Sequence, residues 1–149
     1  MRSEVDAAAD NLWDAVETDV TREGELQRQP HTSDEWQAVR RQAVVLVEAS
    51  NLLLIEGRPV SAVPFAAEAQ GALDSEHITQ LIANNRAAFD QFAVALRGGA
   101  GAMLKAIDAK DPTALVKAGG ALDEICESCH LTFWYPNQRI PALPAPIGR

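Results

Sequence analysis

The sequence predicts an all-α protein, built as an antiparallel up-down-up-down four-helix bundle with a proline-rich C-terminal tail. Apolar residues recur at steps of three and four along four segments, which is the helical period, and no useful run alternates with the period of a strand. Alanine is abundant, and aromatic residues make up only 5% of the 149 residues. This balance favours helix, and the short and medium connections favour an up-down arrangement.

The first two segments follow the helical period from the N-terminus. We expect the first helix over roughly 3–21, where the apolar residues form one stripe. The second helix begins near Thr32 and Glu35, which have the spacing of a capping box. Gly57 and Pro59 then provide the stop that a helix of this length needs.

Residues 58–74 lose the helical period, and we expect them to form a crossover loop. Asp74 or Ser75 caps a third helix, whose apolar stripe continues to Ile107. The stretch RGGAGA at 97–102 interrupts this helix. Glycine in a helix costs about 1 kcal/mol relative to alanine. The glycines therefore predict either a weak point or a close helix crossing.

The fourth segment has the clearest start. Asp111 suits the N-cap and Pro112 suits the first helical position. The apolar stripe that follows steps by four and three, through Leu115, Gly119, Leu122, Cys126, Cys129 and Phe133. We expect residues 1–135 to form the bundle. Residues 136–149 are rich in proline and form an extended tail, because proline interrupts helices.

The charge of the chain restricts its partners. The formal net charge is −8, and residues 1–35 hold ten acidic and three basic side chains. An acidic end argues against nucleic acid or an anionic membrane surface, because both attract positive charge. No apolar run approaches the roughly 20 residues of a membrane span, so we expect none. The N-terminal stretch has no apolar core of a signal peptide, so the chain is cytosolic or its export signal has been removed.

Cys126, Cys129 and His130 form the pattern C-x-x-C-H in the stretch CESCH. Their spacing places all three side chains along one edge of the fourth helix. C-x-x-C-H is the attachment sequence of c-type haem. Each thiol forms a thioether with a haem vinyl group, and the adjacent imidazole reaches the iron as axial ligand. The predicted cofactor is therefore one covalent haem c per chain.

Three other interpretations compete with haem attachment. A structural zinc site needs two more ligands beside the cysteines, and the chain offers only His31, His77 and His130 without a matched second pair. A thioredoxin-like redox pair expects a βαβ setting, which the sequence lacks. Cys126 and Cys129 also fit as two small core residues.

CESCHLTF at the end of a fourth helix, in an alanine-rich acidic chain, resembles the class II c-type cytochromes, the cytochrome c prime and cytochrome c-556 group. The resemblance covers roughly residues 3–135, although only the haem motif is specific. It implies covalent haem on Cys126 and Cys129, His130 as proximal iron ligand, a left-handed antiparallel bundle and a periplasmic location. Export would explain the missing signal peptide.

Two parts of the chain depart from the family pattern. Members usually carry an aromatic and then a basic residue just after the motif, whereas here Phe133 is followed by the run Trp134, Tyr135 and Pro136. The connection near 22–32 is also distinctive. The bulky run predicts a different cover over the proximal side, and we place Phe133 in the haem pocket.

The sixth iron ligand decides between functions. In an antiparallel bundle, the residues level with the haem come from about 5–16, 47–57 and 77–89. No methionine lies at these levels, and Met103 is expected in the core. Leu12 is the preferred distal residue, with Trp13 as the choice if the register shifts by one. His77 is the remaining candidate for a distal ligand.

Two functional classes follow from these residues. With an apolar distal pocket, the iron is five-coordinate and the protein binds nitric oxide or carbon monoxide or exchanges electrons. With a distal ligand such as His77, the protein is a six-coordinate periplasmic electron carrier that docks a basic redox partner. We expect no enzymatic activity, because no nucleophile and base are arranged together. The alanine and valine of the first two helices are compatible with a homodimer.

Overall fold

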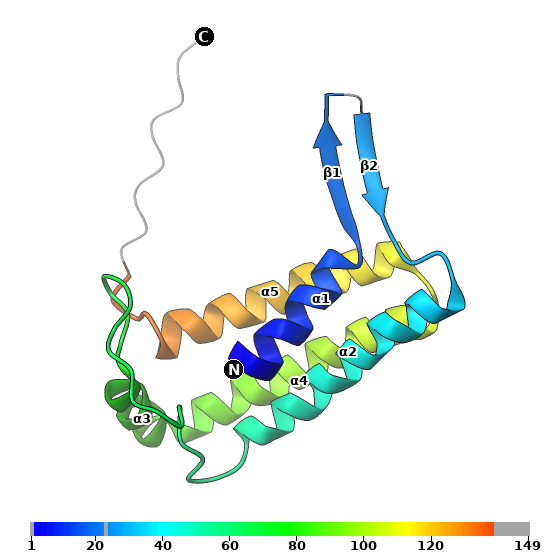
Figure 1. Cartoon of the computed structure of the whole chain (residues 1–149). Coiled ribbons are helices and arrows are strands. Elements are labelled where there is room, and N and C mark those ends of the chain that lie inside the picture. Colours follow the sequence, from blue (N-terminus) through cyan, green and yellow to red (C-terminus); the bar gives the residue numbers. More distant parts are fainter. Residues whose placement is uncertain (1, 23, 139–149) are drawn as a thin grey trace.

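The computed structural model describes residues 2–22 and 24–138. Within them the regular elements are helices, apart from one two-stranded hairpin (Figure 1). The elements in order are η1 (Arg2–Asp6), α1 (Ala7–Asp14), β1 (Glu17–Thr21), β2 (Gly24–Arg28), α2 (Ser33–Leu53), α3 (Ser75–Asn84), α4 (Arg86–Asp108) and α5 (Pro112–Phe133). The prediction of a helical protein with helices packed against one another is confirmed.

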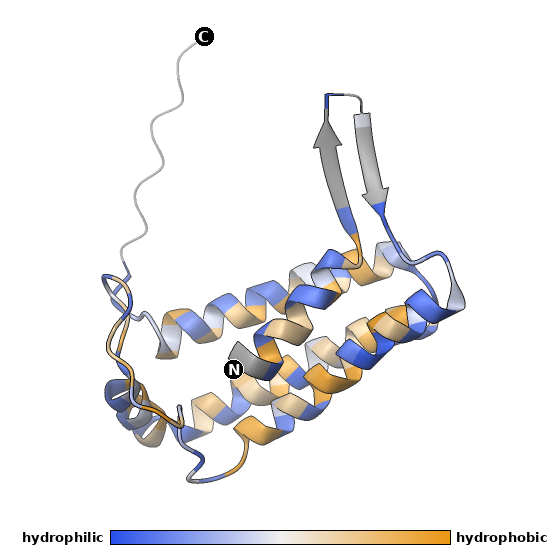
Figure 2. Ribbon diagram, viewed as in Figure 1, coloured by the Kyte–Doolittle hydropathy of each residue, from blue (hydrophilic) through white to orange (hydrophobic). Residues whose placement is uncertain are grey.

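Three long helices, α2, α4 and α5, form the body of the molecule. α4 packs against both α2 and α5, and α1 packs mainly on α2 with a smaller contact to α5. The apolar stripes of these helices meet in one core (Figure 2). The largest fully buried side chains are Leu12, Leu46, Ser50, Met103, Leu115 and Leu122. The prediction that Met103 is a core residue is confirmed.

α2 begins as the sequence predicts and ends at Leu53, four residues before the predicted stop at Gly57. The backbone N–H of Glu35 donates to Thr32 Oγ1 at 3.2 Å, and Glu35 Oε2 accepts from the Thr32 backbone N–H at 2.8 Å. This reciprocal pair is the capping box, and it satisfies two donors that a helix start leaves free. After the helix, Gly57 adopts a φ of +71°, a conformation that glycine accepts without strain.

The first helix differs from the prediction of one helix over 3–21. α1 ends at Asp14, and residues 17–21 and 24–28 pair as antiparallel strands instead. Residues of β1 such as Thr18 and Val20 are β-branched, a class that favours strands. Gly24 opens β2 with a φ of +134°, which residues with a side chain rarely adopt. The expectation of no sheet was therefore wrong for this segment.

The third predicted helix is divided at Asn85 rather than at the glycine cluster. Asn85 has φ −131° and ψ 36°, and its side-chain amide donates to the Leu81 carbonyl at 2.9 Å. The Arg86 guanidinium donates to the carbonyls of Leu53 and Leu54 at 3.3 and 2.9 Å. These bonds hold the start of α4 at the end of α2.

The glycine cluster lies inside an unbroken α4, and Gly99 marks a close helix crossing. A Cβ built on Gly99 would come within 3.0 Å of Leu122 Cδ1 and 3.2 Å of Ile125 Cδ1, both on α5. Nothing lies within 4 Å of the corresponding position at Gly98 or Gly101. Of the two predicted alternatives, the close crossing is the one found.

α5 begins as predicted, with Pro112 in its first turn and the Asp111 carboxylate accepting from the Ala114 N–H at 2.9 Å. The helix ends at Phe133, beside the loop between α2 and α3 (Figure 1). Of the predicted tail at 136–149, residues 136–138 are non-helical, and 139–149 lie outside the described residues. The division into bundle and tail stays a prediction.

Candidate functional site

The last turns of α5 border a small apolar cavity against α4. Cys126, Cys129 and His130 line it together, as their spacing predicts. The other lining residues come from α2, α4 and α5 and are apolar: Leu53, Phe89, Phe92, Ala93, Leu96 and Ile125. Two thiols and one imidazole therefore face a common apolar space.

Both thiols are half-buried and unbridged. Burial is the main reason that the pKa of Cys126 and that of Cys129 are each raised to about 11. The carboxylates of Asp123 and Asp6 add to the shift at Cys126. A redox-active C-x-x-C pair lowers the pKa of its attacking thiol. The environment of these cysteines opposes that use.

The imidazole of His130 contacts two aromatic rings at the end of α5. Its centroid lies 5.0 Å from the Trp134 ring at an interplanar angle of 89°, and 5.8 Å from the Tyr135 ring. Within residues 2–22 and 24–138, no hydrogen bond to either ring nitrogen of His130 is found. Both nitrogens thus keep their capacity for a further partner.

Phe133 lies behind the cavity wall. Its side chain is buried, and its ring makes edge contacts with Phe89 and Phe92 at centroid distances of 5.4 and 6.1 Å. It does not line the cavity itself. Phe133 therefore supports the two aromatic rings that do.

Leu12 and Trp13, the residues expected on the distal side, do not line this cavity. Leu12 is fully buried in the main core. The indole N–H of Trp13 donates to the Gly119 carbonyl at 3.2 Å. Gly119 precedes Cys126 by seven residues, which is about 10 Å along a helix. Trp13 instead borders a separate open groove of about 350 Å³ with Gly119 and Asp123.

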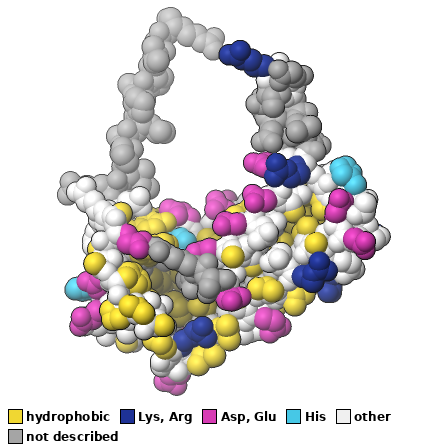
Figure 3. All heavy atoms as spheres, in the orientation of Figure 1, with side chains coloured by type: hydrophobic (Ala, Val, Ile, Leu, Met, Phe, Trp, Pro, Cys, Tyr) yellow, Lys and Arg dark blue, Asp and Glu magenta, His cyan; other side chains and the backbone are white. Residues whose placement is uncertain are grey.

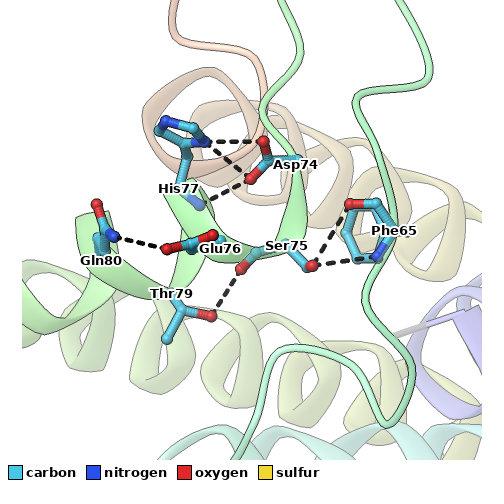
Figure 4. Close-up of polar contacts among 7 residues, drawn as sticks. All are labelled: Phe65, Asp74, Ser75, Glu76, His77, Thr79 and Gln80. Carbon is cyan, nitrogen blue, oxygen red and sulfur yellow. Dashed lines mark hydrogen bonds and ion pairs between the residues drawn. The ribbon is translucent and has the colours of Figure 1, made fainter.

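His77 stands in the first turn of α3 and is exposed, with 64% of its side chain accessible. Its Nδ1 lies 2.8 Å from the Asp74 carboxylate, and its backbone N–H donates to Asp74 Oδ1 at 2.9 Å (Figure 4). The Asp74 carboxylate accepts a hydrogen bond from the imidazole, and this raises the pKa of His77. The imidazole is therefore held by its own helix cap and is not among the cavity residues.

Sequence reasoning missed the individual cavity walls. Leu53, Phe89 and Phe92 belong to helices that the periodicity predicted, but apolar period alone does not rank core positions by function. It also missed the contacts of Tyr135, whose hydroxyl donates to Glu127 Oε2 at 2.6 Å. The run of aromatic residues after the motif was the sequence signal that pointed to contacts at the end of α5.

The donor set fits a haem c, whereas the space is small. Two thiols and a free imidazole on one helix edge, against an apolar wall, are the groups that covalent haem requires. The cavity holds only about 20 Å³, while cofactor sites commonly enclose about 300–1,000 Å³. Side chains that line the cavity must therefore move to admit the macrocycle.

Other metal chemistry has less support. Among the residues that the structure describes, no three His, Cys, Asp or Glu side chains are grouped so that they could hold a metal ion. The pair of cysteines thus lacks the further ligands of a structural zinc site.

No described helix has both the length and the apolar composition needed to cross a membrane.

Comparison with protein-family models, curated proteins and solved structures gave no match. The comparisons therefore assign no family, and the site rests on its own residues.

Proposed function

We propose that this protein is a c-type cytochrome with one covalently attached haem. The observation that carries the proposal is the shared cavity: Cys126, Cys129 and His130 line one apolar space at the end of α5. Cys126 and Cys129 would hold the haem by thioether bonds, and His130 would be the proximal iron ligand. The proposal includes the finer fold, an antiparallel four-helix bundle of α1, α2, α4 and α5, in which α1 is short.

The chain's own residues define what such a haem could do. When bound, the haem would supply an iron centre that exchanges electrons and binds small neutral gases. Phe89 and Phe92 would exclude water from it, because their rings form part of the apolar wall. Among the described residues, the wall contains no methionine and no histidine other than His130. We therefore propose a five-coordinate iron with an apolar distal side.

The partner of an electron-exchanging site would be basic. Asp6 and Asp123 lie close enough to Cys126 to raise the pKa of its thiol. Residues 3–16 and 118–138 contain no lysine or arginine. Acidic side chains are seen along this face of α1 and α5 (Figure 3). A periplasmic location, implied by the resemblance, would place the protein among such partners.

An optical spectrum tests the proposal. The chain would be expressed with a c-type haem assembly system, and ferric and ferrous spectra recorded with and without carbon monoxide. We expect covalent haem that resists acid-acetone extraction and a ferrous spectrum that shifts with carbon monoxide. A double variant with Cys126→Ser and Cys129→Ser is expected to lose the covalent haem. Absence of covalent haem in the parent chain would refute the proposal.

Coordination is tested by a second pair of variants. His130→Ala is expected to change the ferrous spectrum without the carbon monoxide ligand, because the proximal donor is lost. His77→Ala is the matched control and is expected to change nothing, since His77 is bound to Asp74. If the parent chain gave a low-spin spectrum that became high-spin in His77→Ala, the protein would instead be a six-coordinate electron carrier.

A further inference from the structure

We infer that Trp134 and Tyr135 are positioning residues that fix the orientation of the His130 imidazole relative to the cavity. The inference rests on the proposed function, in which His130 is the iron ligand. It gives a role to the aromatic run that follows the C-x-x-C-H motif, a run that departs from the family pattern.

The backbone at the end of α5 brings both rings to His130. The N–H groups of Trp134 and Tyr135 both donate to the His130 carbonyl oxygen, at 2.8 and 2.9 Å. One carbonyl thus accepts two bonds where the helix ends, which fixes the peptide of the proposed ligand. The same turn folds the two side chains back beside the imidazole.

The two side chains then contact the imidazole on neighbouring sides. The Trp134 ring meets it edge to face, and the Tyr135 ring lies against it at 56°. The two rings also contact each other at a centroid distance of 5.7 Å. Tyr135 is anchored in turn, because its hydroxyl donates to the Glu127 carboxylate on α5 at 2.6 Å. Hydrogen bonds to a charged acceptor are among the stronger ones.

The crossover segment secures this arrangement from outside. The Leu73 N–H donates to the Trp134 carbonyl at 2.8 Å. Gly71 has a φ of +89°, and a Cβ there would come within 3.0 Å of the Gln138 backbone. Only glycine fits so close an approach at that backbone angle. The segment thereby holds the chain that follows α5 in place.

Metal-binding histidines are usually oriented by a hydrogen bond from the second ring nitrogen. In the described part of the chain, His130 has ring contacts instead of such a bond. Packing against Trp134 and Tyr135 would therefore set the ring rotation that a hydrogen bond sets elsewhere. That rotation affects the iron–histidine bond and, through it, the reduction potential.

The test uses the haem-loaded full chain and measures the iron–histidine stretching band by resonance Raman, together with the midpoint reduction potential. Trp134→Leu is expected to shift and broaden the band and to change the potential, because the edge contact is lost. Trp134→Phe keeps an aromatic ring and is expected to restore most of the parent values. Trp13→Phe removes an indole remote from the cavity and is the control, expected to match the parent.

Tyr135→Phe separates anchoring from ring contact. The ring remains while its bond to Glu127 is lost, so we expect a smaller change than in Trp134→Leu. Haem-loaded Trp134→Leu with the parent band and potential would overturn the inference while leaving the proposed function intact. A parent chain that carries no covalent haem would overturn both.

Discussion

The thiols of Cys126 and Cys129 lie in surroundings that keep them protonated. Burial raises the pKa of each to about 11, and the acids Asp6 and Asp123 contribute at Cys126. Because the pKa is higher in the folded than in the unfolded state, the protonated thiol favours the folded state below the unfolded-state pKa. This contribution to stability is lost as the pH rises through the folded-state pKa. Near neutral pH almost all of each thiol is protonated, so without haem the cysteines are expected to be unreactive.

Alkylation of the haem-free, reduced chain measures this directly. At pH 8, we expect iodoacetamide to modify the folded thiols about 100-fold more slowly than the urea-unfolded thiols, because two pKa units reduce the thiolate about 100-fold. The folded rate is expected to climb steadily up to about pH 11. Mass spectrometry would follow the reaction. Equal rates in the folded and unfolded chains would contradict the buried environment.

His77 and Asp74 form a pair whose two pKa values move in opposite directions. The hydrogen bond that the imidazole donates to Asp74 raises the pKa of His77 above 6.5, and the bond that the His77 backbone N–H donates lowers the pKa of Asp74. The histidine contribution to stability is present below pH 6.5 and is lost as the pH rises through the raised value. The aspartate contribution is present above its ordinary pKa and is lost in acid.

A proton NMR titration of the His77 ring is expected to give a midpoint above 6.5. Asp74→Asn removes the charge while keeping a helix cap, so the midpoint is expected to fall back toward 6.5. An unchanged midpoint in Asp74→Asn would show that the pair does not form in solution. The same titration separates a free His77 from an iron-bound one, which would not titrate in this range.

At the scale of elements, α4 and α5 lie close together at Gly99, where α4 lacks a side chain. Gly99 faces Leu122 and Ile125 of α5, whereas no atom lies within 4 Å of the position that a Cβ on Gly98 would occupy. Ile125 also lines the cavity next to Cys126. The crossing therefore sets how near α4 lies to the candidate site.

Alanine substitutions at Gly98 and at Gly99 are expected to change the free energy of unfolding in different ways. Gly98→Ala should raise the free energy of unfolding by up to about 1 kcal/mol, from helix propensity alone. Gly99→Ala gains the same propensity but overpacks the crossing, which typically costs about 1–3 kcal/mol. It should therefore be less stable than Gly98→Ala by about that amount. Urea unfolding of both variants gives the comparison. Equal stabilities would mean that the side chains of Leu122 and Ile125 move aside without cost.

At the scale of the whole molecule, the hairpin stands apart from the helices. β1 and β2 pair with each other, and neither makes an extensive contact with any helix (Figure 1). The ion pair between Glu17 and Arg28 joins the two strands at their base, with N and O 3.4 Å apart, and both side chains are exposed. A lone two-stranded hairpin is marginal in water, so it contributes little to the core.

Replacing residues 17–28 by a short glycine-serine linker tests this independence. We expect the free energy of unfolding to change by less than about 1 kcal/mol, because isolated hairpins add little stability. The far-UV circular dichroism should keep its helical shape. A loss above about 2 kcal/mol would show that the hairpin packs on the helices, since hairpins that stand alone do not stabilise a core.

Local chemistry is what the sequence determined by itself. The Thr32–Glu35 capping box, the Asp111–Pro112 start and the i, i+3, i+4 spacing of the motif all act within a few residues. Interactions of this range form whatever the rest of the chain does. The starts of α2 and α5, and the common edge of the two cysteines and His130, therefore agree with the sequence, whereas α2 ends at Leu53, before the predicted stop.

Contacts between distant segments were decided only by the tertiary structure. Next to the break at Asn85, the Arg86 guanidinium donates to carbonyls at the end of α2, and the Trp13 indole donates to a carbonyl more than 100 residues away. The walls of the cavity come from three helices. Periodicity defines which face of a helix is buried but not the partner or the level along it, because these depend on how whole helices pack.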